Sequence, residues 1–179
     1  LGMHGHVTGD SAFDDVAVDA DALLGSIGQG FRIAMGTIDM ARTGLGAIGC
    51  GIGRAAFDEA VAYAGDREQG GKPVGEYQAV QVLVADMDSR LESARSLVYD
   101  SAVRIADGGG DTRASSRAKF TASDAAEFCA RNAMQIYGGK GYPTDYPLER
   151  YYRDARILSI IGGTSGTPKT TVADGVLGL

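Results

Sequence analysis

Residues 77–98 read YQAVQVLVADMDSRLESARSLV and carry the clearest structural signal in the chain. Their apolar residues step by three and four positions, at Tyr77, Val80, Val84, Met87, Leu91, Ala94 and Val98. This spacing is typical of one face of an α-helix, not of a strand. It predicts a long helix that ends at about Asp107.

Similar stripes predict further helices on both sides of this segment. One runs from Phe31 to about Asp66, one occupies residues 118–135 and ends at Gly138-Gly139, and a short charged one runs from Glu149 to about Leu158. Glycine-rich turns separate them, at residues 70–73, 108–110 and 162–164. We predict a mainly α fold, an antiparallel four-helix-type bundle over residues 26–179. The internal glycines of the first helix indicate that another backbone or a flat ligand lies close to it.

Residues 1–25 have a different pattern, with Val7, Phe13, Val16 and Val18 spaced among polar residues. We predict a short β segment of one or two strands here. Because so few strands cannot bury a face alone, we expect them to belong to a larger sheet whose other strands lie outside this sequence. The chain is then expected to begin inside a domain.

Composition excludes several classes of protein. Against 17 Lys and Arg stand 23 Asp and Glu, a net charge of −6, which argues against binding to nucleic acid or to an anionic membrane. The chain has neither an apolar run long enough to span a membrane nor a signal peptide at its start, so we predict a cytoplasmic protein. Cys50 and Cys129 have no CxxC neighbour and the two histidines are His4 and His6, so no metal site is expected. We expect both cysteines to be reduced core residues.

Polar residues on the helical stripes are the candidates for function. Asp39 and Arg42 are three positions apart and share a helix face, so they form either a simple surface ion pair or a ligand-binding pair. The charged segment 149–156 is by default an ion-pair network. The paired glycines at 138–139 and 162–163 offer backbone N–H groups to an anion, but neither has a nucleotide-binding spacing.

Several of these segments together resemble the C-terminal half of the acyl-CoA dehydrogenase family. The resemblance rests on AYAGDR at 62–67, Gln78, LVADM at 83–87, Ala118-Lys119, QIYGGKGY at 135–142, ERYYRDARI at 149–157 and GTS at 163–165. FDDVAV at 13–18 is similar to the end of that family's middle β-domain. By this resemblance residues 1–25 are the tail of the β-domain, and residues 26–179 are the C-terminal helical bundle.

The resemblance implies an FAD-dependent oxidoreductase that desaturates acyl-CoA thioesters, with a cofactor shared between subunits. Its implied partners are an acyl-CoA substrate, further copies in a dimer or tetramer, and an electron-transfer flavoprotein. The implied cofactor-binding residues are Arg67, Gln69, Tyr77, Gln78, Gln135, Gly138, Gly139 and Thr164. The implied substrate-binding residues are Asp39, Arg42 and Gly163.

The chain departs from the family pattern at the catalytic base. The family commonly has glutamate where this chain has Gly162, and some members place the base where this chain has Ala41. Neither residue can remove a proton, so no catalytic base is identified, and Asp39 is the nearest charged candidate. The alternatives are a non-catalytic partner subunit or assembly module of a heteromeric enzyme, or a different flavin chemistry.

Two further departures concern turns. Gly70 stands where an aromatic residue is common in the family, and Pro168 lies where the last helix usually continues without proline. Because proline suits the first turn of a helix, we predict a late start for this helix, with Thr167 as its N-cap.

Overall fold

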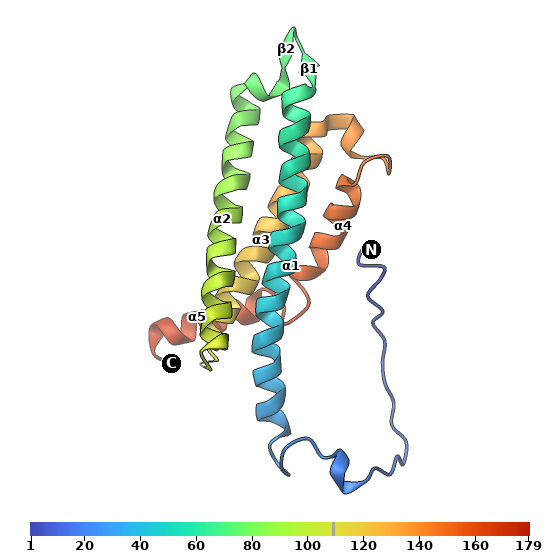
Figure 1. Ribbon diagram of the computed structural model, residues 1–179, viewed down its shortest axis with the longest axis vertical. Helices are drawn as coiled ribbons and strands as arrows, with labels where there is room; N and C mark the ends of the chain where they lie inside the picture. The colour runs from blue at the N-terminus through green and yellow to red at the C-terminus, as the bar shows by residue number, and fades with distance from the viewer. Residues whose placement is uncertain (109) are drawn as a thin grey trace.

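Four helices lie side by side and alternate in direction in the computed structural model, which describes residues 1–108 and 110–179 (Figure 1). The helices are α1 (Gly30–Asp66), α2 (Gln78–Ala106), α3 (Thr112–Tyr137) and α4 (Leu148–Leu158), and α5 (Gly166–Leu177) lies across one end of the bundle. Short 3₁₀ helices occur at η1 (Ala20–Ala22), η2 (Val74–Glu76) and η3 (Gly138–Gly141). The predicted fold class, a mainly α antiparallel bundle, is confirmed.

The turn at the tip of α1 is a small antiparallel hairpin. Strands β1 (Glu68–Gln69) and β2 (Lys72–Pro73) pair Gln69 with Lys72, and Gly70 and Gly71 have φ values of +63° and +83°. Positive φ at both central residues is the requirement of the tightest hairpin turns, which glycine meets without strain. A Cβ on Gly70 would also lie 2.6 Å from the Tyr77 hydroxyl oxygen, so a larger residue there requires Tyr77 to shift.

The helix α3 is the centre of the bundle and packs against α1, α2, α4 and α5. Its inward face is built from alanine, serine and Cys129, and it allows α1 to approach closely. Cβ atoms built on Gly46, Gly49 and Gly53 of α1 would each contact the α3 backbone within 3.4 Å. The close approach predicted from the glycines of this helix is therefore confirmed.

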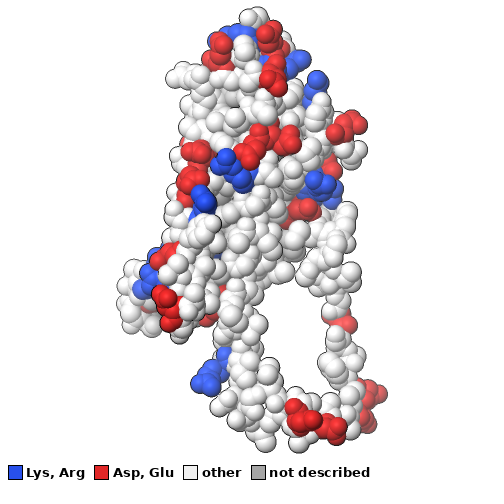
Figure 2. Space-filling model, viewed as in Figure 1, with Lys and Arg blue, Asp and Glu red and all other residues white. Residues whose placement is uncertain are grey.

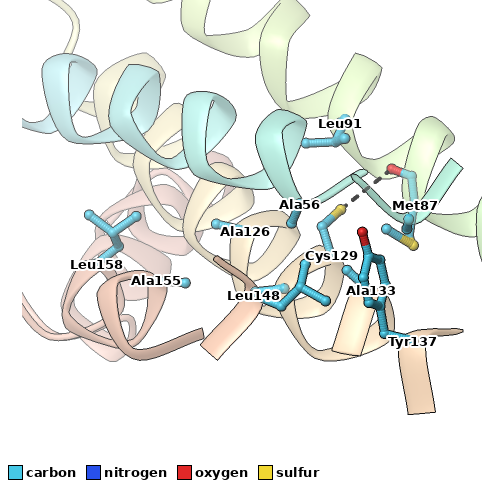
Figure 3. Close-up of a cluster of buried hydrophobic side chains, with 12 residues drawn as sticks. Ala56, Met87, Leu91, Ala126, Cys129, Ala133, Tyr137, Leu148, Ala155 and Leu158 are labelled. Atoms are coloured by element: carbon cyan, nitrogen blue, oxygen red, sulfur yellow. Dashed lines mark hydrogen bonds between the residues drawn. The ribbon is translucent and has the colours of Figure 1, made fainter. Parts of the chain in front are cut away.

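The hydrophobic core lies between these helices and the short α4 (Figure 3). Met87 and Leu91 from α2, Leu148 and Leu158 from α4, and Cys129 from α3 are almost completely buried in it. The Cys129 thiol points toward the backbone carbonyl of Met87. Cys129 is thus a core residue as predicted, whereas Cys50 is only half-buried.

Two helix ends show how the turns are defined. The Asp111 side chain caps α3 by accepting from the amides of Arg113 and Ala114, at 3.0 and 3.1 Å. The predicted glycine turn before this helix includes Gly109, which lies outside the described residues. The prediction of Thr167 as N-cap of the last helix is wrong, because α5 begins at Gly166 and Ser165 precedes it. Pro168 fits inside the first turn, where backbone N–H groups have no intrahelical partner.

The strands predicted within residues 1–25 are not observed. This segment runs as extended chain with the single turn of η1, and Val7, Phe13 and Val18 are exposed (Figure 1). A strand needs a neighbour for its backbone hydrogen bonds, and no described segment offers one here.

None of the described helices is long and apolar enough to cross a membrane.

Candidate functional site

Arg42 is almost completely buried on α1 and connects three parts of the chain. Its Nε donates to the carbonyl oxygen of Gly162 at 3.1 Å, and its Nη1 donates to Asp39 Oδ1 and Ser116 Oγ, both at 3.3 Å. Only 9% of the residue is exposed. Asp39 and Arg42 therefore form a partly buried pair that reaches a turn 120 residues away, not a simple surface ion pair.

Both carboxylate oxygens of Asp39 accept hydrogen bonds from the start of α3. Besides Arg42, Oδ1 accepts from Ser115 Oγ at 3.2 Å, and Oδ2 accepts from Thr112 Oγ1. These partners occupy acceptor positions on both oxygens and fix the orientation of the carboxylate. This arrangement orients Arg42 and leaves Asp39 poorly placed to take a proton from a ligand.

Residues 162–164 lie in the turn that follows α4, and side chains of two other helices donate to its carbonyl oxygens. We call this segment the clamped turn. Gly162 and Gly163 have φ values of +70° and +95°, a conformation that favours glycine. Arg42 binds the Gly162 carbonyl, and Lys119 Nζ donates to the Gly163 carbonyl at 2.8 Å. The fully buried Lys119 was not predicted as a site residue, although it is part of the Ala118-Lys119 motif.

The environment of Lys119 disfavours its charged form. Burial and then the neighbouring Arg42 lower the pKa of Lys119 below its ordinary value, while Asp124 opposes them. Neither position at which a base is expected supplies a carboxylate. Gly162 has no side chain, and Ala41 has only a methyl group and is exposed on α1. A Cβ on Gly162 would lie 2.6 Å from Leu45 Cδ1, so Leu45 occupies the start of the path that a side chain would take.

A second site lies at the opposite end of the bundle, and we call it the hairpin-end groove. It is a cavity of about 450 Å³ between the end of α1, the hairpin and the end of α3. Of the predicted cofactor-binding residues, four line it: Arg67, Gln69, Gly138 and Gly139. The lining also includes Tyr63, Tyr137 and Lys140, which the sequence analysis did not select. Figure 2 shows charged side chains of both signs at this end of the molecule.

The remaining predicted cofactor residues are placed around this groove or away from it. The Tyr77 hydroxyl donates to the Gln69 carbonyl at 2.7 Å, which fixes Tyr77 beside the groove. Gln78 and Gln135 are exposed at the adjoining helix ends. Thr164 instead lies in the clamped turn, and the 25 positions between Arg42 and Arg67 correspond to roughly 37 Å along α1. The predicted cofactor residues of one chain therefore divide between two distant ends.

Aromatic side chains form the floor of the hairpin-end groove. The rings of Tyr63 and Tyr137 stack with centroids 3.9 Å apart, and the Tyr137 hydroxyl donates to Glu59 at 2.9 Å. Burial, followed by this hydrogen bond, raises the pKa of Tyr137 well above its ordinary value. The available signals were sequence positions: Tyr137 directly precedes Gly138, and Tyr63 lies one helical turn before Arg67.

The groove has the chemistry that a nucleotide requires. Arg67 and Lys140 supply cations for phosphate, and Cβ atoms built on Gly138 and Gly139 would meet nothing within 4 Å. The Tyr63–Tyr137 stack supplies an aromatic surface. FAD is therefore a cofactor that these residues fit. The described residues contain no cluster of three or more His, Cys, Asp or Glu suited to a metal ion.

The fold is a helical-bundle domain with polar groups gathered at both ends of the bundle. The family model of the acyl-CoA dehydrogenase C-terminal domain matches residues 28–177, and the chain belongs to that family.

Three relatives agree with this assignment. Acryloyl-CoA reductase (NADH) of Anaerotignum propionicum is 43% identical over 177 residues, 99% of this chain and 45% of that protein. Subunit CarC of the caffeyl-CoA reductase-Etf complex of Acetobacterium woodii is 39% identical over 174 residues, 97% of this chain and 46% of that protein. The structure of butyryl-CoA dehydrogenase from Megasphaera elsdenii matches with a TM-score of 0.90 and 41% identity, covering 92% of this chain and 43% of that one. The chain thus spans about half the length of the curated relatives it matches.

Proposed function

We propose that this chain is the C-terminal domain of an FAD-dependent oxidoreductase of acyl-CoA thioesters in which Gly162 replaces the usual glutamate base. The observation that carries the proposal is the clamped turn. It retains the Asp39–Arg42 pair and the buried Lys119 around a position that has no carboxylate. Residues 1–25 are then the tail of the β-domain, and residues 26–179 are the bundle domain.

Each FAD molecule would be shared by two copies of the chain. One copy would bind its nucleotide part and the other would contact its flavin part. Arg67, Gln69, Gly138 and Gly139, with Tyr77, Gln78 and Gln135 beside them, would bind the nucleotide part in the hairpin-end groove. Thr164 would contact the flavin part of another cofactor molecule, because it lies too far from the groove to reach the same one. When bound, FAD supplies a two-electron acceptor for hydride.

The chain's own residues orient a thioester without removing its α-proton. Gly163 would present its backbone to the thioester. Arg42, oriented by Asp39, would hold the turn through the Gly162 carbonyl. Proton abstraction requires a base within hydrogen-bond reach of the α-carbon. Asp39 is engaged by three donors and Lys119 is buried, so neither meets this requirement.

The test uses the full-length protein, with FAD, under anaerobic conditions. We expect tight FAD binding and measurable binding of butyryl-CoA, without bleaching of the flavin absorbance when the thioester is added. Rapid bleaching would show that another residue acts as the base. Loss of FAD binding in the Arg67→Ala variant, measured by flavin fluorescence, checks the hairpin-end groove independently of turnover.

A second candidate is a non-catalytic partner subunit in a heteromeric enzyme, and a family member with different flavin chemistry is a further alternative. The missing carboxylate favours the partner role, since a chain that keeps its clamped turn and cofactor groove needs a base only in its sister chain. The partners we propose are a second copy or a sister chain, together with an electron-transfer flavoprotein, in the cytoplasm. Co-expression with a glutamate-bearing relative tests this role. The role predicts that the two chains purify together and that only the mixed complex turns over substrate.

A further inference from the structure

Lys119 is a buried cation on a helix face lined mainly by small residues. It is 0% exposed, and its neighbours on the inward face of α3 are alanines and serines. Burying a charge costs several kcal/mol unless partners compensate for the lost water. The only described acceptor for its Nζ is the carbonyl oxygen of Gly163, at 2.8 Å.

The charged groups around Lys119 do not neutralise it. On α1, Arg42 adds a second cation, and the Asp39 carboxylate is bonded to Arg42, Ser115 and Thr112. On α3, Asp124 attracts Lys119 but is itself paired with Lys169 of α5 at 3.7 Å. On α2, Asp86 and Arg90 line a surface groove with Asp124. The α4 group in this region is the uncharged backbone carbonyl of Leu158, which accepts a hydrogen bond from Ser123.

Two adjacent carbonyl oxygens of the clamped turn are thus bound by two cations from two helices. Arg42 approaches from α1 and Lys119 from α3, and the Lys119 Cε lies 3.9 Å from the Cβ position of Gly162. Gly162 and Gly163 have positive φ and no side chains of their own. Ser165 joins the ends of the loop, because its backbone N–H and its Oγ donate to the Ser159 carbonyl at 3.0 and 3.2 Å. Within this closed loop, Arg42 and Lys119 are the side chains from other helices that fix the Gly162 and Gly163 carbonyls.

We propose that Lys119 is a positioning residue that acts through its ammonium group, fixing the Gly163 carbonyl so that the turn from Gly162 to Thr164 is held ready for the thioester. The inference rests on the proposed function and adds a residue and a protonation state to it. A hydrogen bond from an ammonium group is stronger than one from a neutral amine. The turn is therefore held firmly while Lys119 is protonated and loosens at alkaline pH.

The experiment compares three variants of the full-length, FAD-loaded protein with the wild type. Lys119→Met removes the donor and keeps most of the side-chain volume, and Lys119→Arg keeps a permanent charge. The matched control is Ser123→Ala, which removes a buried hydroxyl one turn along α3 that bonds to the backbone carbonyls of Lys119 and Leu158 and not to the turn. Two quantities are measured across a pH series: amide hydrogen exchange of the peptide covering residues 159–168, and the dissociation constant of butyryl-CoA.

We expect Lys119→Met to speed exchange in this peptide several-fold at neutral pH and to weaken butyryl-CoA binding roughly tenfold, the equivalent of about 1.4 kcal/mol. Wild-type protein should approach the same values as the pH rises, after correction for intrinsic exchange. Lys119→Arg should stay near wild type and lose the pH dependence, and Ser123→Ala should match wild type in both quantities.

Two results would overturn the inference. One is that Lys119→Met and Ser123→Ala are indistinguishable, and the other is that wild type and Lys119→Met share the same pH dependence. Failure of the wild type to bind butyryl-CoA would count against the proposed function instead. In that case the exchange comparison still decides whether Lys119 holds the turn.

Discussion

A Cβ atom built on Gly49 would lie 2.9 Å from the carbonyl oxygen of Ala122 on the neighbouring helix. Real Cβ atoms do not approach a backbone oxygen so closely, so α1 and α3 can be this near only because position 49 is glycine. Cβ atoms on Gly46 and Gly53 would lie 3.4 Å from backbone atoms of Ala118 and Ala126, and closer, at 2.9 and 2.7 Å, to the α2 side chains of Val98 and Leu91. The relative position of Arg42 on α1 and Lys119 on α3, and with it the clamped turn, depends on this helix spacing.

Substitution of Gly49 by alanine is expected to destabilise the protein by about 1–3 kcal/mol, because α1 must move away from the α3 backbone. The matched control is Gly51→Ala, on the same helix, where a Cβ would meet nothing within 4 Å. That variant should gain up to about 1 kcal/mol from its better helix propensity. Urea unfolding of both variants measures the difference, and equal stabilities would contradict the close contact.

Introducing glutamate at position 162 is expected to destabilise the protein by about 1–3 kcal/mol, because a side chain there must adopt positive φ. Its Cβ would also displace Leu45 Cδ1. Leu45→Val removes that atom, so the double variant should lose less stability than the sum of the two single changes. A thermal-unfolding double-mutant cycle measures this coupling. Strict additivity would show that Leu45 does not obstruct a side chain at 162.

Global stability should rise at alkaline pH because the cost of burying the Lys119 charge is relieved, even though its local hydrogen bond to Gly163 weakens. Burial and Arg42 lower the pKa of Lys119 in the folded state, so between that value and about 10.5 the unfolded chain binds more protons than the folded one. The free energy of unfolding therefore rises with pH across this window. The difference in unfolding free energy between wild type and Lys119→Met, measured in urea over a pH series, isolates the effect of Lys119. Cys129 and Tyr137 titrate in both proteins, so their effects cancel. A difference that does not change with pH would contradict the prediction.

The two cysteines should differ strongly in alkylation rate. Burial raises the pKa of Cys129 to about 12, and the residue is 0% exposed, whereas Cys50 is half-buried in a groove between α1 and α2. Because the thiolate is the reactive form, iodoacetamide at mildly alkaline pH should modify Cys50 at least tenfold faster. Peptide mass spectrometry follows both sites, and unfolding in urea should abolish the difference. Equal rates in the folded protein would place Cys129 outside the core.

The sequence predicted the helices well but not every face that they bury. In α2 the apolar stripe gives the core correctly, since Met87, Leu91 and Ala94 are buried. In α1 the apolar residues Leu45, Ile48 and Ile52 step by three and four positions, yet Ile48 is 42% exposed, while the glycines at 46, 49 and 53 are buried. Hydrophobic periodicity cannot identify this face, because the contact with α3 selects residues for small size and not for hydrophobicity.

The candidate site was predictable only where a residue type suggests its own chemistry. Asp39 and Arg42 could be paired from their spacing, but their link to Gly162 joins residues 120 positions apart. Lys119 could not be found by residue-type reasoning, because lysine is ordinarily a surface residue. The strands expected before residue 25 are not observed, because a strand is stable only with pairing partners and the described residues supply none there.

The 37-residue length of α1 constrains how the chain can change in evolution. Each residue in an α-helix turns the chain by about 100°, so a single insertion between Arg42 and Arg67 would rotate one end relative to the other. Such an insertion would break the glycine contacts with α3 and redirect Arg67 away from its groove. Length variation among homologues should therefore be confined to the loops, with this rod kept at constant length.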